Sequence, residues 1–469
     1  MFRKALMYSF ASKYVTLIIQ IASTLILARI LTPEHIGLFT VAAALTGIAQ
    51  MFRDFGISEY IIKERDSSYS TLSTAFTASI LIAWPIAFLM MAITPLIGSF
   101  YEQDEAGWLV FILSFNMFLS PFGSIAMAVM RKNMNYKPIS FANVGNTMVN
   151  ALASIIFAYY DFGAYSLAFA SVLGTITTVS IITLYKGSDI SFGVQFKGTR
   201  RVFDFGKNVG GSNIFNYIAN NILEIFIAKA ITLDTLGLYS RGRSTITLFE
   251  IGIIDAVKPL ISPYFAQSVN KKSLQEAYLT CTKIILYFSI PFTIIVTSLN
   301  ESILYILYGE QWLDAGKYLS LLAGLYCIYT ITLFYEQVLT VTNNDKLYMK
   351  FKVSLSLFRL ILGSTIFVLP LEQVLISFYC IASSRLLWVI WSLRKLISLS
   401  ITNYIKTLLK PIVASIGVTI FVTLYKYQQE SLFEWQLFLY LLLAGLSWLS
   451  VIYLIDKPVI NIVLGKQAK

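Results

Sequence analysis

Charged residues are scarce in this chain of 469 residues, and so are the residues that build metal and redox sites. Asp, Glu, Lys and Arg together make up 13% of the sequence, about half of their share in a soluble domain. The chain has one histidine, His35, and three cysteines, Cys281, Cys327 and Cys380, that form no CxxC or Cys/His pattern. These shortages argue against a disulfide framework and a zinc site. They also leave too little charge to keep the surface in water.

Several functional signatures are also missing. The sequence contains no Gly-rich loop that would cradle phosphates and no nucleophile elbow, so neither ATP-driven transport nor hydrolase chemistry is indicated, and we expect no cofactor. The net charge is +11, but the basic residues lie in short loops and form no stripe with base-stacking aromatics. Nucleic acid is therefore not an expected partner.

Long apolar runs are what the chain has in abundance. Hydrophobic residues make up 57% of it, and the mean hydropathy is +0.70. In hydrocarbon the backbone polar groups find partners only inside helices or closed barrels, and these runs are too long and too evenly apolar for barrel strands. The sequence therefore predicts an all-α polytopic membrane protein with about 14 transmembrane helices. The expected spans are 12–31, 36–52, 75–98, 106–128, 141–160, 163–185, 207–230, 238–256, 280–299, 316–341, 351–369, 371–393, 407–425 and 434–455.

Two local features bear on these spans. Lys13 interrupts the first apolar run and no small-residue cleavage site follows it, so we expect the first span to stay in the mature protein rather than act as a signal peptide. Four prolines are expected to kink the helices that contain them. They are Pro85, Pro95, Pro121 and Pro291.

The distribution of basic residues predicts the orientation. With the N-terminus placed inside, 25 of the 36 Lys and Arg residues fall in loops and ends on the inner side, six at the outer side and five within or beside spans. Short cytoplasmic loops are enriched in Lys and Arg. We therefore expect both termini to be cytoplasmic, in the inner membrane of a bacterium.

An internal repeat divides the chain. Residues 28–40 (ARILTPEHIGLFT) align without gaps on residues 228–240 (AKAITLDTLGLYS). Six spans separate the copies, so the repeat is expected to be parallel, with a pseudo-two-fold axis along the membrane normal. This predicts two six-helix lobes and two additional C-terminal helices. The expected boundaries are 1–185 for the N-lobe, 186–206 for a cytoplasmic linker, 207–396 for the C-lobe and 397–469 for the C-terminal pair and tail.

The same offset aligns polar residues within the first span of each lobe. Their spacing places each set on one helical face, which can either line a cavity between the lobes or bind helices together by hydrogen bonds. The two sets are Lys13, Thr16, Gln20 and Thr24 in the first copy and Asn213, Asn216, Asn220 and Glu224 in the second.

Two segments carry a family resemblance. ILARILTPEHIGLFTVAAALTGIAQMFRDFGISEYIIKERD resembles the start of polysaccharide flippases of the Wzx and colanic-acid-exporter type, and FDFGKNVGGSNIFNYIANNILEIFIAKAI, followed by LGLYSRGRS, is similar to the seventh and eighth helices of that family. The resemblance implies the superfamily that includes multidrug exporters and lipid II flippases. It implies transport of an undecaprenyl-pyrophosphate-linked oligosaccharide from the cytoplasmic to the periplasmic leaflet, for O-antigen, capsule or exopolysaccharide assembly. Polymerase and chain-length proteins of the pathway would be possible partners.

Such a substrate directs attention to basic residues in the spans, because the arginine fork binds pyrophosphate through paired hydrogen bonds. Arg241 and Arg243 open the eighth span, where they either contact the headgroup or snorkel and form ion pairs. Arg29 and Lys229 occupy matching positions at the outer ends of their spans, where snorkelling is the simpler interpretation.

Charges deeper in the spans need a partner or water. Arg359 and Arg385 are candidate substrate ligands for this reason, together with Gln20, Asn213, Asn216 and Asn220 from the repeat. Glu224 and Glu250 are candidates for ion coupling, because a buried acid beside a cavity can carry protons; for Glu250 an ion pair with Arg243 is the alternative.

Two other functions compete with the flippase. A membrane glycan polymerase or ligase is also polytopic and basic, although it usually has a large outer loop, and here every outer loop is short. An ion-coupled drug exporter of the same superfamily is the second alternative. The glycolipid branch is favoured by the LTPEHIGLF and RDFG elements and by the additional C-terminal helices.

Overall fold

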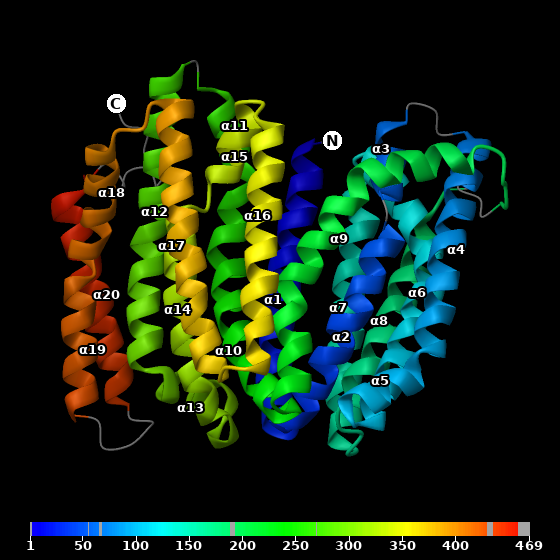
Figure 1. Cartoon of the computed structure of the whole chain (residues 1–469), viewed down its shortest axis with the longest axis horizontal. Coiled ribbons are helices and arrows are strands. Elements are labelled where there is room, and N and C mark those ends of the chain that lie inside the picture. Colours follow the sequence, from blue (N-terminus) through cyan, green and yellow to red (C-terminus); the bar gives the residue numbers. More distant parts are fainter. Residues whose placement is uncertain are drawn as a thin grey trace. The chain divides into compact units, whose positions relative to one another are not determined.

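The computed structural model describes residues 2–54, 56–64, 68–187, 193–268, 270–428 and 435–457. All regular elements in these ranges are helices (Figure 1). By their internal contacts the residues form two compact units, Met1–Ser240 and Arg241–Lys469. We describe each unit by itself.

Unit 1 (Met1–Ser240) contains long helices and two short ones. Its elements are α1 (Phe2–Ile30), α2 (Pro33–Asp54), α3 (Ile57–Lys63), α4 (Tyr69–Ala92), α5 (Thr94–Tyr101), α6 (Asp104–Lys132), α7 (Tyr136–Tyr159), α8 (Tyr165–Tyr185), α9 (Thr199–Ala230) and the first part of α10 (Leu233–Phe249).

Unit 2 (Arg241–Lys469) begins within α10, and several of its spans are broken into shorter pieces. Its further elements are the π-helix η1 (Glu250–Ile254), α11 (Asp255–Ala266), α12 (Lys271–Ser298), α13 (Asn300–Tyr308), η2 (Glu310–Ala315), α14 (Gly316–Ile331), α15 (Tyr335–Val341), α16 (Asp345–Ser364), η3 (Thr365–Phe367), α17 (Leu371–Ile397), α18 (Ile401–Ala414), α19 (Ile416–Gln428) and α20 (Gln436–Ile455).

Eleven helical segments among the described residues are long and apolar enough to cross a membrane, which confirms the predicted all-α membrane fold. The expected spans 207–230, 238–256 and 351–369 are also helical, as α9, α10 with η1, and α16, but they are not among these eleven segments. They contain many of the polar candidates named above, and polar residues lower the hydropathy of a span. The number fourteen therefore stays a prediction.

The prolines act in two ways. Pro85, Pro121 and Pro291 lie inside α4, α6 and α12, whereas Pro95 stands at the start of α5, just after α4 has ended. Proline is well suited to the first turn of a helix, because the N–H that it lacks would have no partner there. Pro95 thus begins a new helix instead of kinking one.

Two basic residues from separate segments of unit 1 meet Glu64, which follows α3, at one end of the bundle. Lys132, which ends α6, donates from Nζ to the carbonyl oxygen of Glu64 at 2.6 Å, and Arg201 at the start of α9 pairs with the Glu64 carboxylate at 3.1 Å. The alternation of loops predicts that these segments lie at the same end of the bundle. Figure 1 shows α3 at that end.

The two copies of the sequence repeat touch within unit 1. Thr40 donates from Oγ1 to Oγ of Ser240, 200 positions further along the chain, at 3.1 Å. A Cβ on Gly37 would clash with the carbonyl oxygen of Leu233, and a Cβ on Gly237 would clash with that of Pro33. Equivalent residues therefore make reciprocal contacts, as a two-fold axis between the copies would produce, and both glycines are required for the approach.

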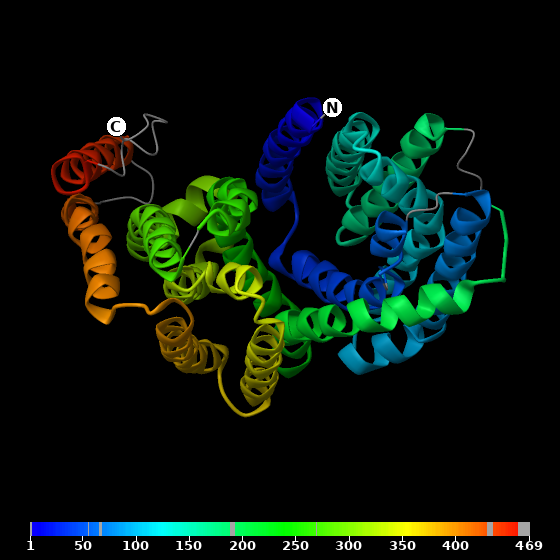
Figure 2. The ribbon, with the colours of Figure 1, turned by 90° about the horizontal axis from the view of Figure 1, so that it is seen from above.

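The contacts divide the chain after Ser240, which is not the position of the expected linker. The segment 186–206 is expected to be a linker because it is the largest loop, between the sixth and seventh spans, and the lobe boundaries stay a prediction. In the structure α9 packs against α2 and α4, so residues up to Ser240 belong with the N-terminal helices. Seen from above, α9 lies beside α2 (Figure 2).

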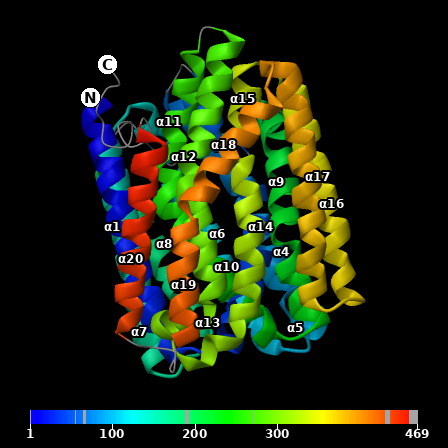
Figure 3. The same ribbon diagram turned by 90° about the vertical axis from the view of Figure 1, so that its left-hand side faces the viewer.

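The core of unit 2 lies between α12, α15 and α17, where Tyr278, Tyr335 and Val389 are fully buried. A second apolar cluster joins the C-terminal helices to the rest of the unit: Val422 of α19 and Leu437 of α20 pack with Leu299, which follows α12. Figure 3 shows α19 and α20 side by side. The expected C-terminal helix pair is thus present, and its first member is broken at Ser415.

Candidate functional site

Two arginines that the sequence singled out separately meet in unit 2. The guanidinium of Arg359 on α16 lies 5.6 Å from the ring centroid of Tyr329 on α14, and that of Arg385 on α17 lies 5.1 Å from the same ring. Arg385 also lies 5.5 Å from the ring of Phe351. Cation–π contacts of this kind stabilise a charge that is removed from water. The structure therefore concentrates two positive charges around one tyrosine.

The arginine pair has both repulsive and attractive charges beside it. Arg359 and Arg385 repel each other, while the carboxylate of Glu336 attracts Arg385 and accepts a hydrogen bond from the Tyr348 hydroxyl at 3.3 Å. The Nε of Arg385 is buried and has no hydrogen-bond partner among the described residues. A buried donor without a partner is costly, so the pair can accept an anionic ligand.

Two adjoining cavities lie between α16 and α17, and Arg385 lines one of them. The larger has a volume of about 460 Å³ and runs between α16 and α17, with Met349, Val353 and Leu357 along one wall. The smaller, of about 90 Å³, includes Arg385 in its lining. Both cavities share Ser354 and Trp388 as lining residues. The two cavities therefore adjoin, and the smaller one lies next to Arg385.

Arg241 has a different environment. It is 5% exposed, and its guanidinium lies 4.4 Å from the ring centroid of Trp312 and 4.8 Å from that of Tyr308. The Tyr308 hydroxyl is hydrogen-bonded to Thr245 Oγ1 at 3.1 Å, one helical turn after Arg241. These contacts pack α10 against α13 and η2. The expected role of Arg241 as a headgroup ligand stays a prediction, and these contacts favour a role in packing. Arg243, in contrast, is only partly buried.

The outer candidates of unit 1 also differ. Arg29 is exposed. Lys229 is paired with Glu102 at 2.9 Å and lies 5.4 Å from the ring of Phe100. The hydrogen bond and charge of Lys229 hold the pKa of Glu102 below its ordinary value. Lys229 therefore fits the snorkelling interpretation better than a role as a free substrate ligand.

The polar residues of the repeat are not uniformly accessible. Gln20 and Asn220 are exposed on α1 and α9, Asn216 is partly buried, and Glu224 is only 8% exposed. The side chain of Asn213 lies outside the described residues. The aligned residues Gln20 and Asn220 are thus both exposed in unit 1, and the role of the two sets as a cavity lining stays a prediction.

Glu250 marks an irregularity in its span. It is the first residue of the π-helix η1, which replaces the α-helix between α10 and α11. Such single π-turns are frequent at functional sites. The sequence gives no signal for this break apart from Gly252, where the surroundings leave space for a side chain.

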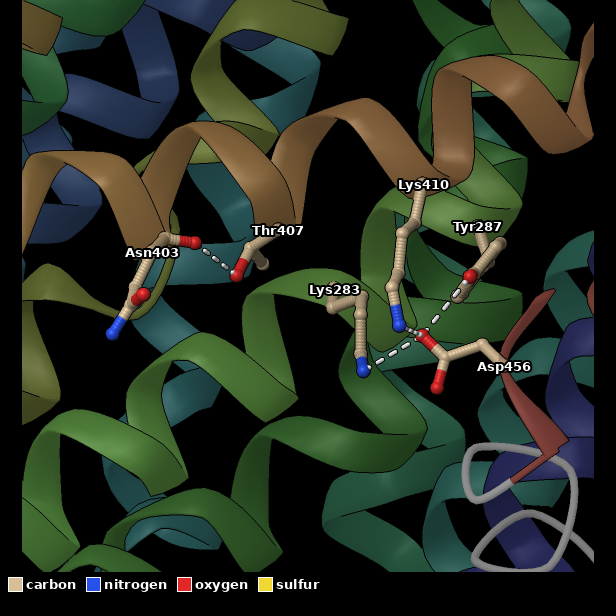
Figure 4. A network of polar contacts seen from close by, with 6 residues as sticks. All are labelled: Lys283, Tyr287, Asn403, Thr407, Lys410 and Asp456. Carbon is tan, nitrogen blue, oxygen red and sulfur yellow. Dashed lines mark hydrogen bonds and ion pairs between the residues drawn. The ribbon is translucent and has the colours of Figure 1, made fainter.

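Sequence reasoning missed one polar cluster altogether. Asp456, just after α20, is 2% exposed, and its Oδ2 accepts from Nζ of Lys283 at 2.8 Å, from Nζ of Lys410 at 3.3 Å and from the Tyr287 hydroxyl at 3.2 Å (Figure 4). The cluster ties the end of α20 to α12 and α18. Lys283, placed inside a span by the sequence, was the one signal that such a partner should exist.

The lysines control the ionisation of this carboxyl. Burial by itself would raise the pKa of Asp456, but the hydrogen bonds and charges of Lys283 and Lys410 outweigh it and lower the pKa below its ordinary value. Asp456 is therefore a carboxylate at neutral pH. It serves as an anchor for the C-terminal helix and not as a proton carrier.

Comparison with known proteins places this architecture in a family. The family described as "Polysaccharide biosynthesis protein" matches residues 26–317. The teichuronic acid biosynthesis protein TuaB of Bacillus subtilis (strain 168) is 24% identical over 418 residues, which cover 86% of this chain and 85% of TuaB. The succinoglycan biosynthesis transport protein ExoT of Rhizobium meliloti (strain 1021) is 24% identical over 320 residues, which cover 67% of this chain and 64% of ExoT.

Among solved structures, the lipid II flippase MurJ in an inward closed conformation has a TM-score of 0.77 to this chain at 15% identity, with 97% of this chain and 99% of MurJ covered. At that identity the likeness shows the fold alone. The matched family residues cover more than half of the chain, and the resemblance to polysaccharide flippases is confirmed. This membrane protein belongs to the polysaccharide biosynthesis protein family.

Proposed function

We propose that the chain is a flippase that moves an undecaprenyl-pyrophosphate-linked oligosaccharide from the cytoplasmic to the outer, periplasmic leaflet by alternating access. Its relatives TuaB and ExoT are named for the biosynthesis or transport of polysaccharides. The pyrophosphate and sugars of such a lipid cannot cross hydrocarbon without a polar path. The protein has to supply that path while the lipid chain stays in the bilayer.

The observation that carries the proposal is the arginine pair Arg359 and Arg385. Ionisable residues within a span are expensive and usually mark a substrate or ion path. Two guanidinium groups around Tyr329 offer planar donors that match the oxygens of a pyrophosphate. Glu336 would limit their charge before the ligand binds, and the ligand would displace this weaker interaction.

The location and partners of the protein are part of this proposal. The 25 basic residues that alternate onto one side support cytoplasmic termini in the cytoplasmic membrane, the inner membrane of a bacterium with two membranes. Polymerase and chain-length proteins would then take over the glycan at the outer leaflet. In this scheme the chain catalyses no bond formation.

Removing the gene tests the proposal. We expect a complete undecaprenyl-linked repeat unit to accumulate in the cytoplasmic leaflet, and surface glycan to disappear. Accumulation of flipped but unpolymerised units would instead identify a polymerase. Normal surface glycan with increased sensitivity to small cationic compounds would identify a drug exporter.

Substitution of the arginine pair tests the residues that carry the proposal. Arg359→Ala and Arg385→Ala should each lower glycan export about tenfold or more at matched membrane abundance, because a charge-assisted contact is worth roughly 1.5–3 kcal/mol. Arg385→Lys should retain part of the activity, since lysine keeps the charge and loses the fork. Arg394→Ala is the control, an exposed arginine in the last turn of the same helix. Wild-type export by both alanine variants would remove the pair from the substrate path.

A further inference from the structure

The helix pair α16 and α17 carries a groove that is lined by both apolar and basic residues. The two helices form a hairpin joined at η3 and lie side by side in unit 2 (Figures 1 and 3). The larger cavity follows the hairpin, and its volume lies in the range of small-molecule pockets. Because it lies between two membrane helices, its natural occupant is a molecule of the bilayer.

The wall that α16 contributes is apolar and open. Met349, Val353 and Leu357 recur every four residues, so they share one helical face, and they are 42%, 39% and 46% exposed. Trp388 of α17 forms part of the opposite wall. Such a surface suits a hydrocarbon chain.

Positive charge lies at the start of the groove and beside its apolar wall. Lys350 belongs to the lining of the larger cavity and, with exposed Lys346 one turn earlier, lies at the start of α16, which the charge rule places at the cytoplasmic surface. The smaller cavity, which shares Ser354 and Trp388 with the larger one, has Arg385 in its lining. The guanidinium of Arg385 lies 5.5 Å from the ring centroid of Phe351, the residue that follows Lys350. The lining thus combines surface lysines, an apolar wall and a buried arginine.

This combination of residues distinguishes between two kinds of lipid that carry a phosphate. A bulk anionic phospholipid keeps its phosphate at the membrane surface, so the lysines and the apolar wall would satisfy it. Such a phospholipid would leave unused the second cavity, which is lined by a buried guanidinium whose Nε has no hydrogen-bond partner among the described residues. A lipid whose phosphate has to leave the surface and enter the protein uses all three parts.

We propose that the groove between α16 and α17 is a side entrance through which the polyprenyl-pyrophosphate substrate enters unit 2 from the cytoplasmic leaflet. Its hydrocarbon chain lies against Met349, Val353 and Leu357, and its pyrophosphate passes from Lys350 to Arg385. The entrance rests on the proposed flippase function, and it adds which helices admit the lipid.

Photocrosslinking identifies the occupant directly. A photoreactive benzoylphenylalanine at position 353 should capture polyprenyl pyrophosphate lipid in membranes that contain the assembly enzymes, and capture should be lost when synthesis of that lipid is blocked. The same residue at position 387 is the control, because Leu387 is 70% exposed on α17 and does not line either cavity. Capture of phospholipid alone at position 353 would overturn the entrance.

Filling the groove tests its use. Ser354 lines both cavities, so Ser354→Trp should lower glycan export at least tenfold at matched abundance, whereas Leu387→Trp should behave as the wild type. If Ser354→Trp is poorly folded, Val353→Trp blocks the same wall. Normal export by folded Trp variants would overturn the entrance while leaving the flippase intact. If the lipid still moves between the leaflets in cells that lack the protein, the proposed flippase function itself is contradicted.

Discussion

At the scale of single residues, the close approach of the two repeat copies depends on glycine. Gly37 and Gly237 each face a backbone carbonyl of the other copy at a distance that leaves no room for a Cβ. Backbone cannot move aside as a flexible side chain does. The polar contact between Thr40 and Ser240 depends on the same approach.

Gly37→Ala and Gly237→Ala should therefore each destabilise the protein by about 1–3 kcal/mol, as overpacking of a tight contact does. Thermal unfolding in detergent measures the effect. Gly445→Ala is a matched control, because a Cβ at Gly445 in α20 meets nothing within 4 Å, and alanine favours a helix. Equal melting temperatures for all three variants would contradict the close approach.

The Asp456 cluster predicts a dependence of stability on pH. The pKa of Asp456 is lowered in the folded protein, so its contribution is fully present above the ordinary pKa of about 4 and is lost as pH falls through the lower folded value. Asp456→Asn should cost roughly 3 kcal/mol at neutral pH, because two lysines lose their buried partner. It should also remove this part of the acid destabilisation.

Melting temperature as a function of pH, for the wild type and for Asp456→Asn, measures both effects. Asp161→Asn serves as the control, since Asp161 is exposed and in a left-handed conformation that asparagine also adopts. Lys283→Ala should cost more than Lys410→Ala, because Lys283 is closer to Asp456 and less exposed. Parallel pH curves for the wild type and Asp456→Asn would show that the anchor contributes nothing.

At the scale of the element, α10 carries two arginines in different environments. Arg241 lies between two aromatic rings, and a desolvated cation–π contact is worth about 2 kcal/mol. Arg241→Ala should therefore lower the melting temperature and membrane abundance, with Arg241→Lys intermediate. Arg243→Ala should leave abundance unchanged and lower export if this arginine binds the headgroup.

Quantitative immunoblotting, thermal unfolding and glycan export separate the two roles. Export that falls in Arg241→Ala without any loss of stability would restore the original expectation that Arg241 contacts the headgroup. Full stability and export in both alanine variants would exclude either arginine from a functional role.

The element scale also explains which helices were hard to recognise as spans. The least hydrophobic helices, α9, α10 and α16, hold Asn220, Arg241 and Arg359. Their existence could be predicted because the surrounding runs are long and bounded by charge. Their breaks could not: η1 at Glu250 and the break at Ser415 depend on how the two halves of each span pack.

For the whole molecule, the orientation in the membrane is the property with the widest consequences. Single cysteines replacing Asn133 and Lys272, in a background without the native cysteines, should react with a membrane-impermeant thiol reagent only after the membrane is opened. A cysteine replacing Glu310 should react in intact cells. Each of the three native residues is exposed, so failure to react reports the side of the membrane. Labelling at position 133 in intact spheroplasts would reverse the assignment.

The membrane environment, the helical class and the expected sidedness all follow from the sequence itself. In hydrocarbon, long apolar runs pair their backbone groups by forming helices, and the local composition is enough to recognise such helices. The contacts of individual side chains do not follow, because they depend on how each helix is rotated against its neighbours. Arg359 and Arg385 were recognisable as costly charges, but only packing brings both to Tyr329. Likewise, only packing joins Asp456 to lysines from two other helices.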